Sequence, residues 1–365
     1  MHNGVNRQWL LTARPDGMVA SDQFEQREIA IPSLERGQIL GKVLLLSFDP
    51  TQRAWMSMDT YIPAAKLGEP MRAGGIAQII ESRHPKFKPG DIVNSFCGWQ
   101  EYVVFEPDKP EFVPVTRIPG HLDPTLVLAL SLTGLTAYFG LLEIGKPKRG
   151  ETVLISGAAG ATGSIAGQIA KLKGCRVVGI AGGERKREWL LKKANFDAAI
   201  DYKSQDVGEE LTRICPEGID IYFDNVGGSI TDEVLLQIKQ NARIVLCGAI
   251  SQYNNEGHEF YGLKNYLSLI INRANAEGFI ILDYLDRAVE GLLKLTYWVE
   301  KGSIVQEIDL QHGFDNIPST LKRIFTGDNL GKQVLKLSDP PLPVRSKHTE
   351  KIVFKFLQYL SKFRG

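Results

Sequence analysis

The sequence predicts an α/β protein in which a barrel-like all-β domain is joined to a domain built on a doubly wound parallel sheet. From about residue 125 onward, short runs of β-branched residues alternate with helical segments, which is the rhythm of repeated βαβ units. Residues 1 to about 120 instead hold short β-rich runs separated by Gly and Pro, without helical alternation. A chain of 365 residues is long enough for two such domains, each with a sizeable core.

These two sequence patterns predict the helices and strands of each region. In the second region we expect strands near Val153, Val177, Ala198, Ile219 and Arg243, and helices that include 207–215 and 229–239. In the first region we expect strands at 41–48, 75–80, 91–94 and 102–105, which the runs 304–310 and 332–337 rejoin. The predicted domains are therefore 1–124 with 310–337, 125–309, and an extension at 338–365.

The clearest functional signal lies between residues 152 and 187. A buried strand leads into Gly157-Ala-Ala-Gly160-Ala-Thr-Gly163, and a helix follows. Glycines at such a junction let the chain turn sharply and let a pyrophosphate approach the N–H groups of the helix N-terminus. The spacing is GxxGxxG and not the usual GxGxxG, so a purely structural turn is the alternative. We predict a dinucleotide site formed by Gly157, Gly160, Ala161, Thr162 and Gly163.

The end of the next strand indicates which dinucleotide binds. NAD sites normally carry Asp or Glu there, which accepts a hydrogen bond from the ribose 2′-OH. Here the strand ends at Ala181-Gly182-Gly183, and Glu184-Arg-Lys-Arg187 follows. A 2′-phosphate needs space and cations, and this segment offers both. NADPH/NADP+ is predicted, with Gly182 and with Lys186 or a neighbouring arginine at the phosphate. The alternative is that these cations form the solvated face of a helix.

Composition limits the partners and the compartment. The formal net charge is +1, so nothing indicates nucleic acid. The four cysteines are far apart without CxxC, which argues against a disulfide framework and for a cytoplasmic protein. The apolar run 9–11 is too short for a signal peptide. The uncharged stretch 124–142 is interrupted by Ser, Thr and Gly, so we interpret it as a buried helix and not as a membrane span.

Further motifs occur in order between about residues 8 and 337: Leu46-Ser-Phe-Asp-Pro50 with Arg53, Thr133-Gly-Leu-Thr-Ala-Tyr138, Gly174-Cys-Arg-Val-Val-Gly-Ile-Ala-Gly182, Phe223-Asp-Asn-Val-Gly-Gly228, Cys247-Gly-Ala-Ile-Ser251 with Tyr253-Asn254, Gly278-Phe-Ile-Ile and Asn329-Leu-Gly-Lys332. With the glycine turn, they resemble the zinc-independent reductases of the medium-chain dehydrogenase/reductase superfamily, in the branch of curcumin, prostaglandin and alkenal double-bond reductases. The chain has Thr51-Gln52 where that family usually has Tyr-Met, and Gly157 where Ala is frequent. The first departure is expected to reshape the substrate pocket, and the second to leave nucleotide binding intact.

The resemblance implies a fold and a set of binding residues. The fold would be a GroES-like substrate domain with a Rossmann domain, assembled as a homodimer. Cofactor contacts would come from Tyr202 near the adenosine phosphate, Asn225 near the nicotinamide, Asn329 near the diphosphate or ribose, Phe279 and Ile281 in the nicotinamide pocket, and Cys247, Ala249, Ile250 and Tyr253 in their shared motif. Arg53 would belong to the substrate pocket, together with Tyr61 and Tyr253.

The chemistry expected is hydride addition without a metal. Zinc-dependent relatives present Cys, His and Glu ligands early in the chain, whereas here Cys97 is the only cysteine of the first domain, and His84 and His121 lack ligand partners at useful spacing. An α,β-unsaturated ketone or aldehyde would accept hydride at its β-carbon and place negative charge on its carbonyl oxygen. A tyrosine, protonated at pH 7, suits that oxygen as a donor. Tyr253 is the first candidate because it follows a strand end at the carboxyl edge of the sheet, and Tyr61, on a Pro-bounded loop, is the second.

Two alternatives remain at this stage. One is a quinone reductase of the same superfamily, which would have an open pocket without a required tyrosine. The other is an NADPH-binding sensor or structural protein without turnover. The fold alone does not decide between them.

The C-terminal end lies outside the resemblance. After a stiff linker, Asp339-Pro-Pro-Leu-Pro343, one helical stripe contains Val353, Phe356, Leu357, Leu360 and Phe363, and another contains Lys351, Lys355, Gln358 and Lys362. Residues 338–365 carry a net charge of +4. A basic amphipathic helix can lie on an anionic membrane or contact another subunit, and packing on its own subunit is the plainer alternative.

Overall fold

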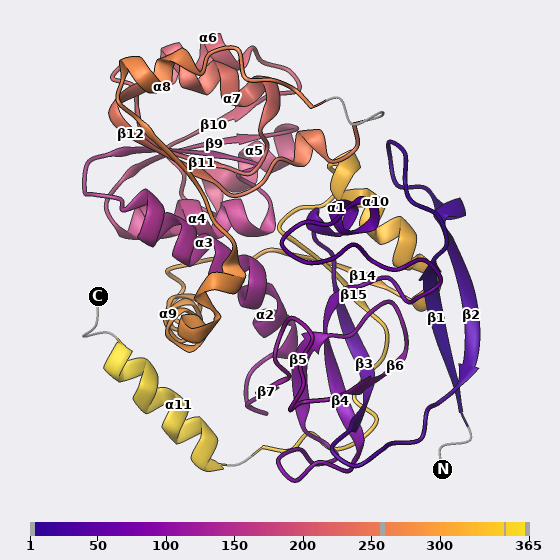
Figure 1. Cartoon of the computed structure of the whole chain (residues 1–365). Helices are drawn as coiled ribbons and strands as arrows, with labels where there is room; N and C mark the ends of the chain where they lie inside the picture. The colour runs from indigo at the N-terminus through magenta and orange to yellow at the C-terminus, as the bar shows by residue number, and fades with distance from the viewer. Residues whose placement is uncertain (1–3, 256–259, 347, 362–365) are drawn as a thin grey trace. The chain divides into compact units, whose positions relative to one another are not determined.

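The computed structural model describes residues 4–255, 260–346 and 348–361, and the chain divides into two compact units (Figure 1). The first unit comprises Met1–Ala129, Ile308–Asp328 and Gln333–Tyr359. The second comprises Leu130–Glu307, Asn329–Lys332 and Leu360–Gly365.

The first unit is built on a seven-stranded sheet in the order β14-β15-β3-β4-β5-β7, with β6 paired to β3, and on a separate hairpin of β1 and β2. Central β3 is buried along nearly its whole length, which matches its run of Val and Leu. The strands are β1 (Val5–Leu11), β2 (Phe24–Ala30), β3 (Ile39–Ser47), β4 (Gly74–Ser82), β5 (Ile92–Phe96), β6 (Tyr102–Phe105), β7 (Thr116–Ile118), β14 (Ile308–His312) and β15 (Lys332–Lys336). The helices are η1 (Ser21–Gln23), α1 (Thr51–Ser57), α2 (Pro124–Ala129), η7 (Phe314–Asn316), α10 (Ile317–Thr326) and α11 (His348–Ser361).

The second unit is built on a six-stranded sheet in the order β10-β9-β8-β11-β12-β13, and its neighbouring strands pair in parallel. The strands are β8 (Thr152–Ser156), β9 (Arg176–Ala181), β10 (Ala198–Asp201), β11 (Ile219–Asp224), β12 (Ile238–Leu246) and β13 (Asn275–Gly278). The helices are η2 (Leu130–Gly134), α3 (Leu135–Phe139), η3 (Gly140–Gly145), α4 (Ala161–Leu172), α5 (Glu184–Lys192), α6 (Val207–Ile214), α7 (Gly228–Leu235), η4 (Ile250–Gln252), α8 (Leu267–Ile271), η6 (Ile281–Arg287) and α9 (Ala288–Glu300). Strand order reverses between β8 and β11, and ligands of doubly wound sheets bind at that point, beyond the carboxyl ends of the strands.

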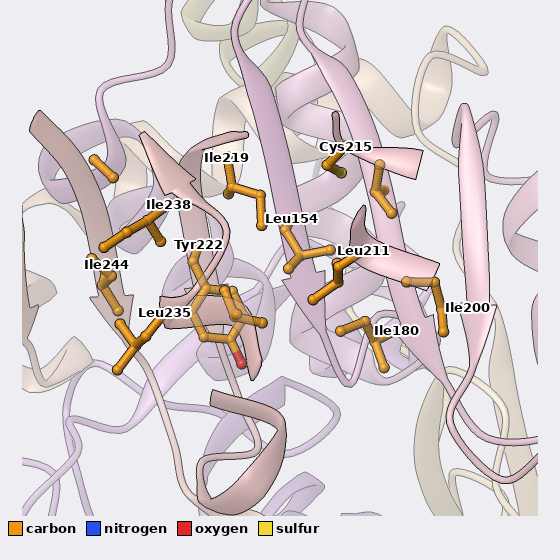
Figure 2. Packing of buried hydrophobic residues seen from close by; sticks show 13 residues of the cluster. Leu154, Ile180, Ile200, Leu211, Cys215, Ile219, Tyr222, Leu235, Ile238 and Ile244 are labelled. Atoms are coloured by element: carbon orange, nitrogen blue, oxygen red, sulfur yellow. The ribbon is translucent and has the colours of Figure 1, made fainter. Parts of the chain in front are cut away.

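The core of the second unit lies between one face of this sheet and the helices α6 and α7. Figure 2 shows Leu154, Ile180 and Tyr222 from three strands meeting Leu211 from α6 and Leu235 from α7. Each of these side chains is at most 1% exposed, and burying a large apolar side chain contributes about 1.5–3 kcal/mol. This packing holds the strand ends, and therefore the site beyond them, in fixed positions.

The predicted fold class is confirmed, with differences in detail. The predicted helix 229–239 is too long, because α7 ends at Leu235 and Ile238 already belongs to β12. The apolar residues of this stretch fit a helical period and a strand equally well, so periodicity did not locate the boundary. The hairpin of β1 and β2 and the strand β13 were not expected.

One helical stretch, Pro124–Gly145, is long and apolar enough to cross a membrane by length and composition. Its most apolar window is 67% buried inside the structure. That degree of burial is typical of a core helix, which is how the sequence was interpreted.

Candidate functional site

The glycine turn between β8 and α4 has the geometry that a phosphate requires. Gly157 has φ +58°, a conformation that glycine adopts at low cost. A Cβ on Gly163 would lie 2.5 Å from the carbonyl oxygen of Gly157, so no side chain fits there. Gly160 is the N-cap of α4, and the first-turn N–H groups of Ala161, Thr162 and Gly163 have no acceptor within the helix. They form an anion site of the kind found at helix N-termini.

A segment distant in the sequence lies against this turn. The N–H of Gly331 donates to the carbonyl oxygen of Ala159 at 2.8 Å, and Gly331 forms an isolated parallel bridge with Gly160. The side-chain amide of Asn329 donates to the carbonyl of Gly331 at 3.2 Å. Asn329 is thus held beside the glycine turn, and its contact with the diphosphate or ribose stays a prediction.

The end of β9 is covered by side chains that follow β10. A Cβ on Gly182 would lie 2.8 Å from the Tyr202 ring and 3.0 Å from Cε of Lys203, so both side chains cover this glycine. The carboxylate of Asp201 accepts from the N–H groups of Gly183 at 2.7 Å and Lys203 at 3.0 Å. Burial opposes ionisation of Asp201, but these bonds and one from Ser204 outweigh it and lower the pKa of the carboxyl. Lys203 was missed from the sequence because its nearness to Gly182 depends on the pairing of β9 and β10.

The cations predicted to bind the 2′-phosphate lie on α5 and differ in their exposure. Arg187 forms a two-point ion pair with Glu184 in the same helix, at 2.7 and 2.8 Å. Lys186 is half-buried, and Arg185 is exposed. Lys186 stays the predicted partner of a 2′-phosphate, and the structure adds Lys203, which lies against Gly182, as a second candidate.

Replacing Lys186 by alanine is expected to raise KM for NADPH about tenfold while KM for NADH changes little. A charge-assisted bond to phosphate is worth roughly 1.5–3 kcal/mol, and NADH has no 2′-phosphate to lose it. Steady-state kinetics with both cofactors measure the effect. Lys192→Ala is the matched control, because Lys192 is a surface cation of the same helix paired with Glu188. Equal effects of Lys186→Ala on both cofactors would contradict the assignment.

Beyond β11, a buried carboxylate organises the turn that holds Asn225. Asp224 is 2% exposed, and its Oδ1 accepts from the hydroxyls of Ser156 at 2.9 Å and Tyr222 at 2.8 Å and from the N–H groups of Val226 and Gly227, both at 2.9 Å. Its Oδ2 accepts from Thr231 at 2.6 Å. Asp224 thereby ties the ends of β8 and β11 to the start of α7.

Ser156 completes the arrangement around Asn225. Its hydroxyl accepts from the N–H of Asn225 at 2.9 Å, and its carbonyl accepts from the Asn225 side-chain amide at 2.7 Å. Neither Asp224 nor Ser156 was singled out from the sequence, although Asp224 stands inside the motif that contains Asn225. Ser156 lies 68 residues from Asp224 and 69 from Asn225 in the sequence, and no local pattern reveals contacts over such separations.

A pocket of about 650 Å³ opens at the carboxyl ends of β11, β12 and β13. It is lined by Asp224, Gly227, Gly228, Thr231, Leu246, Cys247, Gly248, Ala249, Gln252, Tyr253, Tyr261, Leu263, Gly278, Phe279, Ile280 and Asp283. Of the predicted cofactor residues, Cys247, Ala249, Tyr253 and Phe279 are brought together here. Ile250 begins η4 and Ile281 begins η6, each directly after a lining residue.

Tyr253 and Cys247 are two of the polar side chains that line this pocket. The hydroxyl oxygen of Tyr253 accepts from the N–H of Ala249 at 3.3 Å, and a phenol is both a hydrogen-bond donor and an acceptor. Burial, followed by the nearby charge of Asp224, raises the pKa of the Cys247 thiol, so this thiol is neutral at physiological pH. The lining of the pocket thus includes a tyrosine hydroxyl and an uncharged thiol.

The remaining predicted residues belong to the first unit. Arg53 is 4% exposed and donates to the carbonyls of Pro15 and Gly17, at 3.1 and 2.8 Å, and to the Ser57 hydroxyl. Those bonds fix a loop of the first unit, and a role of Arg53 in the substrate pocket stays a prediction. Tyr61 is 45% exposed, and its hydroxyl lies 3.1 Å from that of Thr51. One of the two residues that depart from the family motif thus contacts the second candidate tyrosine.

Comparisons with known proteins agree with this geometry. Residues 7–113 match a family model described as the N-terminal domain of oxidoreductase, and residues 161–296 match one described as zinc-binding dehydrogenase. The NADPH-dependent curcumin reductase of Escherichia coli (strain K12) is 37% identical over 342 residues, which are 91% of this chain and 97% of that protein. The NADP(+)-dependent 2-alkenal reductase of Nicotiana tabacum is 38% identical over 345 residues, 91% of this chain and 98% of that protein. The crystal structure of CurA from Vibrio vulnificus in complex with NADPH has a TM-score of 0.86 at 38% identity and covers 92% of this chain and 100% of that chain.

In the part of the chain that the structure describes, no group of three or more His, Cys, Asp or Glu side chains could hold a metal ion. The residues around the glycine turn and the pocket fit a dinucleotide, because they offer first-turn helix N–H groups without an acceptor in the helix and cations near Gly182. The chain belongs to the medium-chain dehydrogenase/reductase family, with a GroES-like domain and a Rossmann domain, and it is an NADP-dependent oxidoreductase that acts on carbon–carbon double bonds.

Proposed function

We propose that the protein reduces the carbon–carbon double bond of α,β-unsaturated ketones and aldehydes with NADPH and without a metal ion. The observation that supports this most directly is the Tyr253 hydroxyl in the pocket at the carboxyl ends of β11, β12 and β13. NADPH, when bound, supplies hydride for the β-carbon of the substrate.

The protein's part is to orient the substrate and to stabilise charge. Negative charge develops on the carbonyl oxygen as the β-carbon is reduced, and a preorganised hydroxyl donor near that oxygen lowers the barrier. The α-carbon of the resulting enolate then takes a proton, which completes the saturated product. Tyr253 is the proposed donor, and the neutral Cys247 thiol adds no competing negative charge to the pocket.

Oxidation of NADPH in the presence of a panel of enones, enals, quinones and simple ketones tests the proposal. We expect rapid turnover of enones and enals, with the saturated carbonyl compound as product. Turnover of quinones alone would make the protein a quinone reductase. NADPH binding without turnover of any acceptor would make it a sensor or structural protein.

A cytoplasmic location is proposed on the state of the cysteines. All four, Cys97, Cys175, Cys215 and Cys247, are free, and burial raises the pKa of each thiol. Such thiols persist in a reducing compartment.

A homodimer is proposed on the exposed edge of the second unit. The sheet ends at β13, whose four residues are all exposed. Leu267, Ile270 and Ile271 of α8 are each more than half exposed. An uncovered strand edge beside exposed apolar side chains is a surface on which a second copy can pair.

An anionic membrane surface is proposed as the partner of the C-terminal extension. The curcumin reductase and the 2-alkenal reductase each match 91% of this chain. The unmatched share, about a tenth, corresponds in length to residues 338–365. The extension is fixed to the first unit, because the Gln78 amide exchanges two hydrogen bonds of 2.8 Å with the backbone of Leu342, and Glu350 pairs with Arg117 at 2.8 Å.

Helix α11 turns an apolar face outward. Ile352, Val353 and Leu357 are 58%, 55% and 39% exposed, and Lys351 and Lys355 are exposed beside them. Gln358, predicted on the polar stripe, is buried. The side chains of Phe356 and Leu360 and all of Lys362 and Phe363 lie outside the described residues. A basic helix with an exposed apolar face fits an anionic lipid surface.

Cosedimentation with vesicles should therefore detect the full chain on anionic lipid and not on neutral lipid. Ile352→Ser with Val353→Ser is expected to weaken binding at least tenfold, because each buried apolar side chain contributes about 1.5–3 kcal/mol. Sedimentation velocity separates the two surfaces, since a dimer formed through β13 and α8 persists in this variant. Loss of the dimer with no vesicle binding by the parent would assign α11 to a subunit contact.

A further inference from the structure

A second buried carboxylate of the second unit, on α7, accepts hydrogen bonds from three residues of one segment that is neither helix nor strand. Asp232 is 3% exposed, and its Oδ2 accepts from the Tyr261 hydroxyl at 2.8 Å. Its Oδ1 accepts from the backbone N–H groups of Lys264 and Asn265, at 2.9 and 3.0 Å. The side-chain amide of Asn265 also donates to the backbone carbonyl of Asp232 at 3.1 Å. Asp232 therefore fixes residues 260–265 to α7 at several points.

The charge of this carboxylate strengthens the attachment. Burial opposes the ionisation of Asp232, but the hydrogen bonds from the segment outweigh it and lower the pKa of the carboxyl. The bond to Asp232 in turn raises the pKa of the Tyr261 phenol, so the phenol keeps its proton and remains the donor. Hydrogen bonds to an ionised acceptor are about twice as strong as neutral ones. The segment can leave α7 only when these bonds break and a buried charge loses its donors.

The backbone of the same tyrosine is held from another side by η4. The N–H of Tyr261 donates to Oε1 of Gln252 at 2.7 Å. The side-chain amide of Gln252 donates to the Ser251 hydroxyl at 2.9 Å, and that hydroxyl donates to the carbonyl of Val226 at 2.7 Å. Tyr261 thus bridges α7 and η4, and each of these elements contributes a residue, Thr231 or Gln252, to the lining of the pocket.

The anchored segment is itself part of the pocket that contains Tyr253. Tyr261 and Leu263 both line it, and Leu263 is 41% exposed, so its apolar surface is open to a bound molecule. A preformed wall binds a ligand more tightly than a free segment does, because ordering the segment on binding costs conformational entropy. Anchoring by Asp232 removes that cost in advance.

We propose that Asp232 is a positioning residue of the reductase, which holds residues 260–265 so that Tyr261 and Leu263 form one wall of the substrate pocket. Asp232 acts through the residues it holds, because its carboxylate is bonded to the segment. A wall contacts the substrate in the ground state and in the transition state alike, so its loss raises KM more than it lowers kcat. The effect on KM rests on the proposed enone reduction, whereas the anchoring of the segment does not.

Trypsin measures the anchoring directly. Lys264 is exposed, and the peptide bond that follows it carries the Asn265 N–H that donates to Asp232. Cleavage of a folded chain tracks the population in which the segment is released. In Asp232→Ala we expect cleavage after Lys264, identified by mass spectrometry, to be about tenfold faster than in the parent or more, since several bonds to a charged acceptor are lost.

Two further variants complete the comparison. Tyr261→Phe removes only the hydroxyl bond and keeps the two backbone bonds, so it should give an intermediate cleavage rate. Glu233→Ala is the matched control, because it removes a carboxylate of the same helix whose oxygen lies against Gly208 of α6. Cleavage after Lys264 should be unchanged in this control.

Steady-state kinetics with benzalacetone at saturating NADPH test the wall. Asp232→Ala is expected to raise KM for the enone about tenfold and to change kcat by less than about threefold, the pattern of lost uniform binding. Tyr261→Phe should raise KM by a smaller factor, and Glu233→Ala should keep the parent's KM and kcat. A general loss of folded protein would instead lower kcat and leave KM unchanged.

The outcomes separate this inference from the proposed function. Faster cleavage together with a raised KM in Asp232→Ala supports it. Parent-like cleavage, or faster cleavage with a parent-like KM, would overturn it and leave enone reduction standing. If Asp232→Ala does not fold, Tyr261→Phe decides by the same two measurements. If the parent protein does not turn over benzalacetone, enone reduction fails, and the cleavage rates alone support or overturn the anchoring by Asp232.

Discussion

Replacing Tyr253 by phenylalanine is expected to lower kcat for enone reduction about a hundredfold, with the affinity for NADPH retained. The ring keeps its place in the pocket, whereas the hydroxyl that would stabilise the developing enolate oxygen is lost, and removal of one such donor typically costs about a hundredfold or more. Steady-state kinetics with an enone, together with NADPH titration by fluorescence, measure the two quantities separately.

A matched tyrosine controls for general effects of the substitution. Tyr266→Phe removes a hydroxyl from an exposed residue of the same unit and should leave kcat unchanged. Weakened NADPH binding in Tyr253→Phe would indicate that the bond from Ala249 N–H to this hydroxyl shapes the cofactor site. Unchanged kcat with enones would show that Tyr253 is not the donor to the carbonyl oxygen. Tyr61 would then be the next candidate.

The sequence predicts those parts of the fold in which the residue types of the segment itself favour one structure. The runs that form β8 and β9 are β-branched and buried on both faces, so they are legible as interior parallel strands. Strand β13 lacks such a signal, because Asn275-Ala-Glu-Gly278 is exposed along its length and becomes a strand only through pairing with β12. Tertiary context, and not local preference, decides such a segment.

The residues of the candidate site also fall into those that the sequence predicts and those that only the fold reveals. The glycine turn was predictable because Gly157 and Gly163 meet steric requirements set by their immediate neighbours. Lys203 was not, since it gains its importance from Gly182, which the fold brings beside it. Buried polar centres are missed for the same reason, as Asp224 illustrates: its oxygens are shared between two strands and a helix.

That buried carboxylate leads to the second large expected effect. Asp224→Ala should lower the free energy of unfolding by roughly 3 kcal/mol or more, because it leaves the hydroxyls of Ser156, Tyr222 and Thr231 and two backbone N–H groups without their acceptor in the core. Asp224→Asn should cost less, since its amide oxygen can still accept the four bonds now made to Oδ1 and its nitrogen can donate to the Thr231 hydroxyl. Urea denaturation of the three proteins gives the comparison.

NADPH affinity gives an independent measure of the same network. Asp224 contacts no part of the predicted phosphate turn, but it fixes Val226 and Gly227, and so the position of Asn225 beside Ser156. Asp224→Asn, if it folds, should therefore bind NADPH more weakly than the parent while its unfolding free energy falls only modestly. Parent-like stability in Asp224→Ala would mean that water or a neighbouring group satisfies those donors, and the carboxylate would then have no organising part in the site.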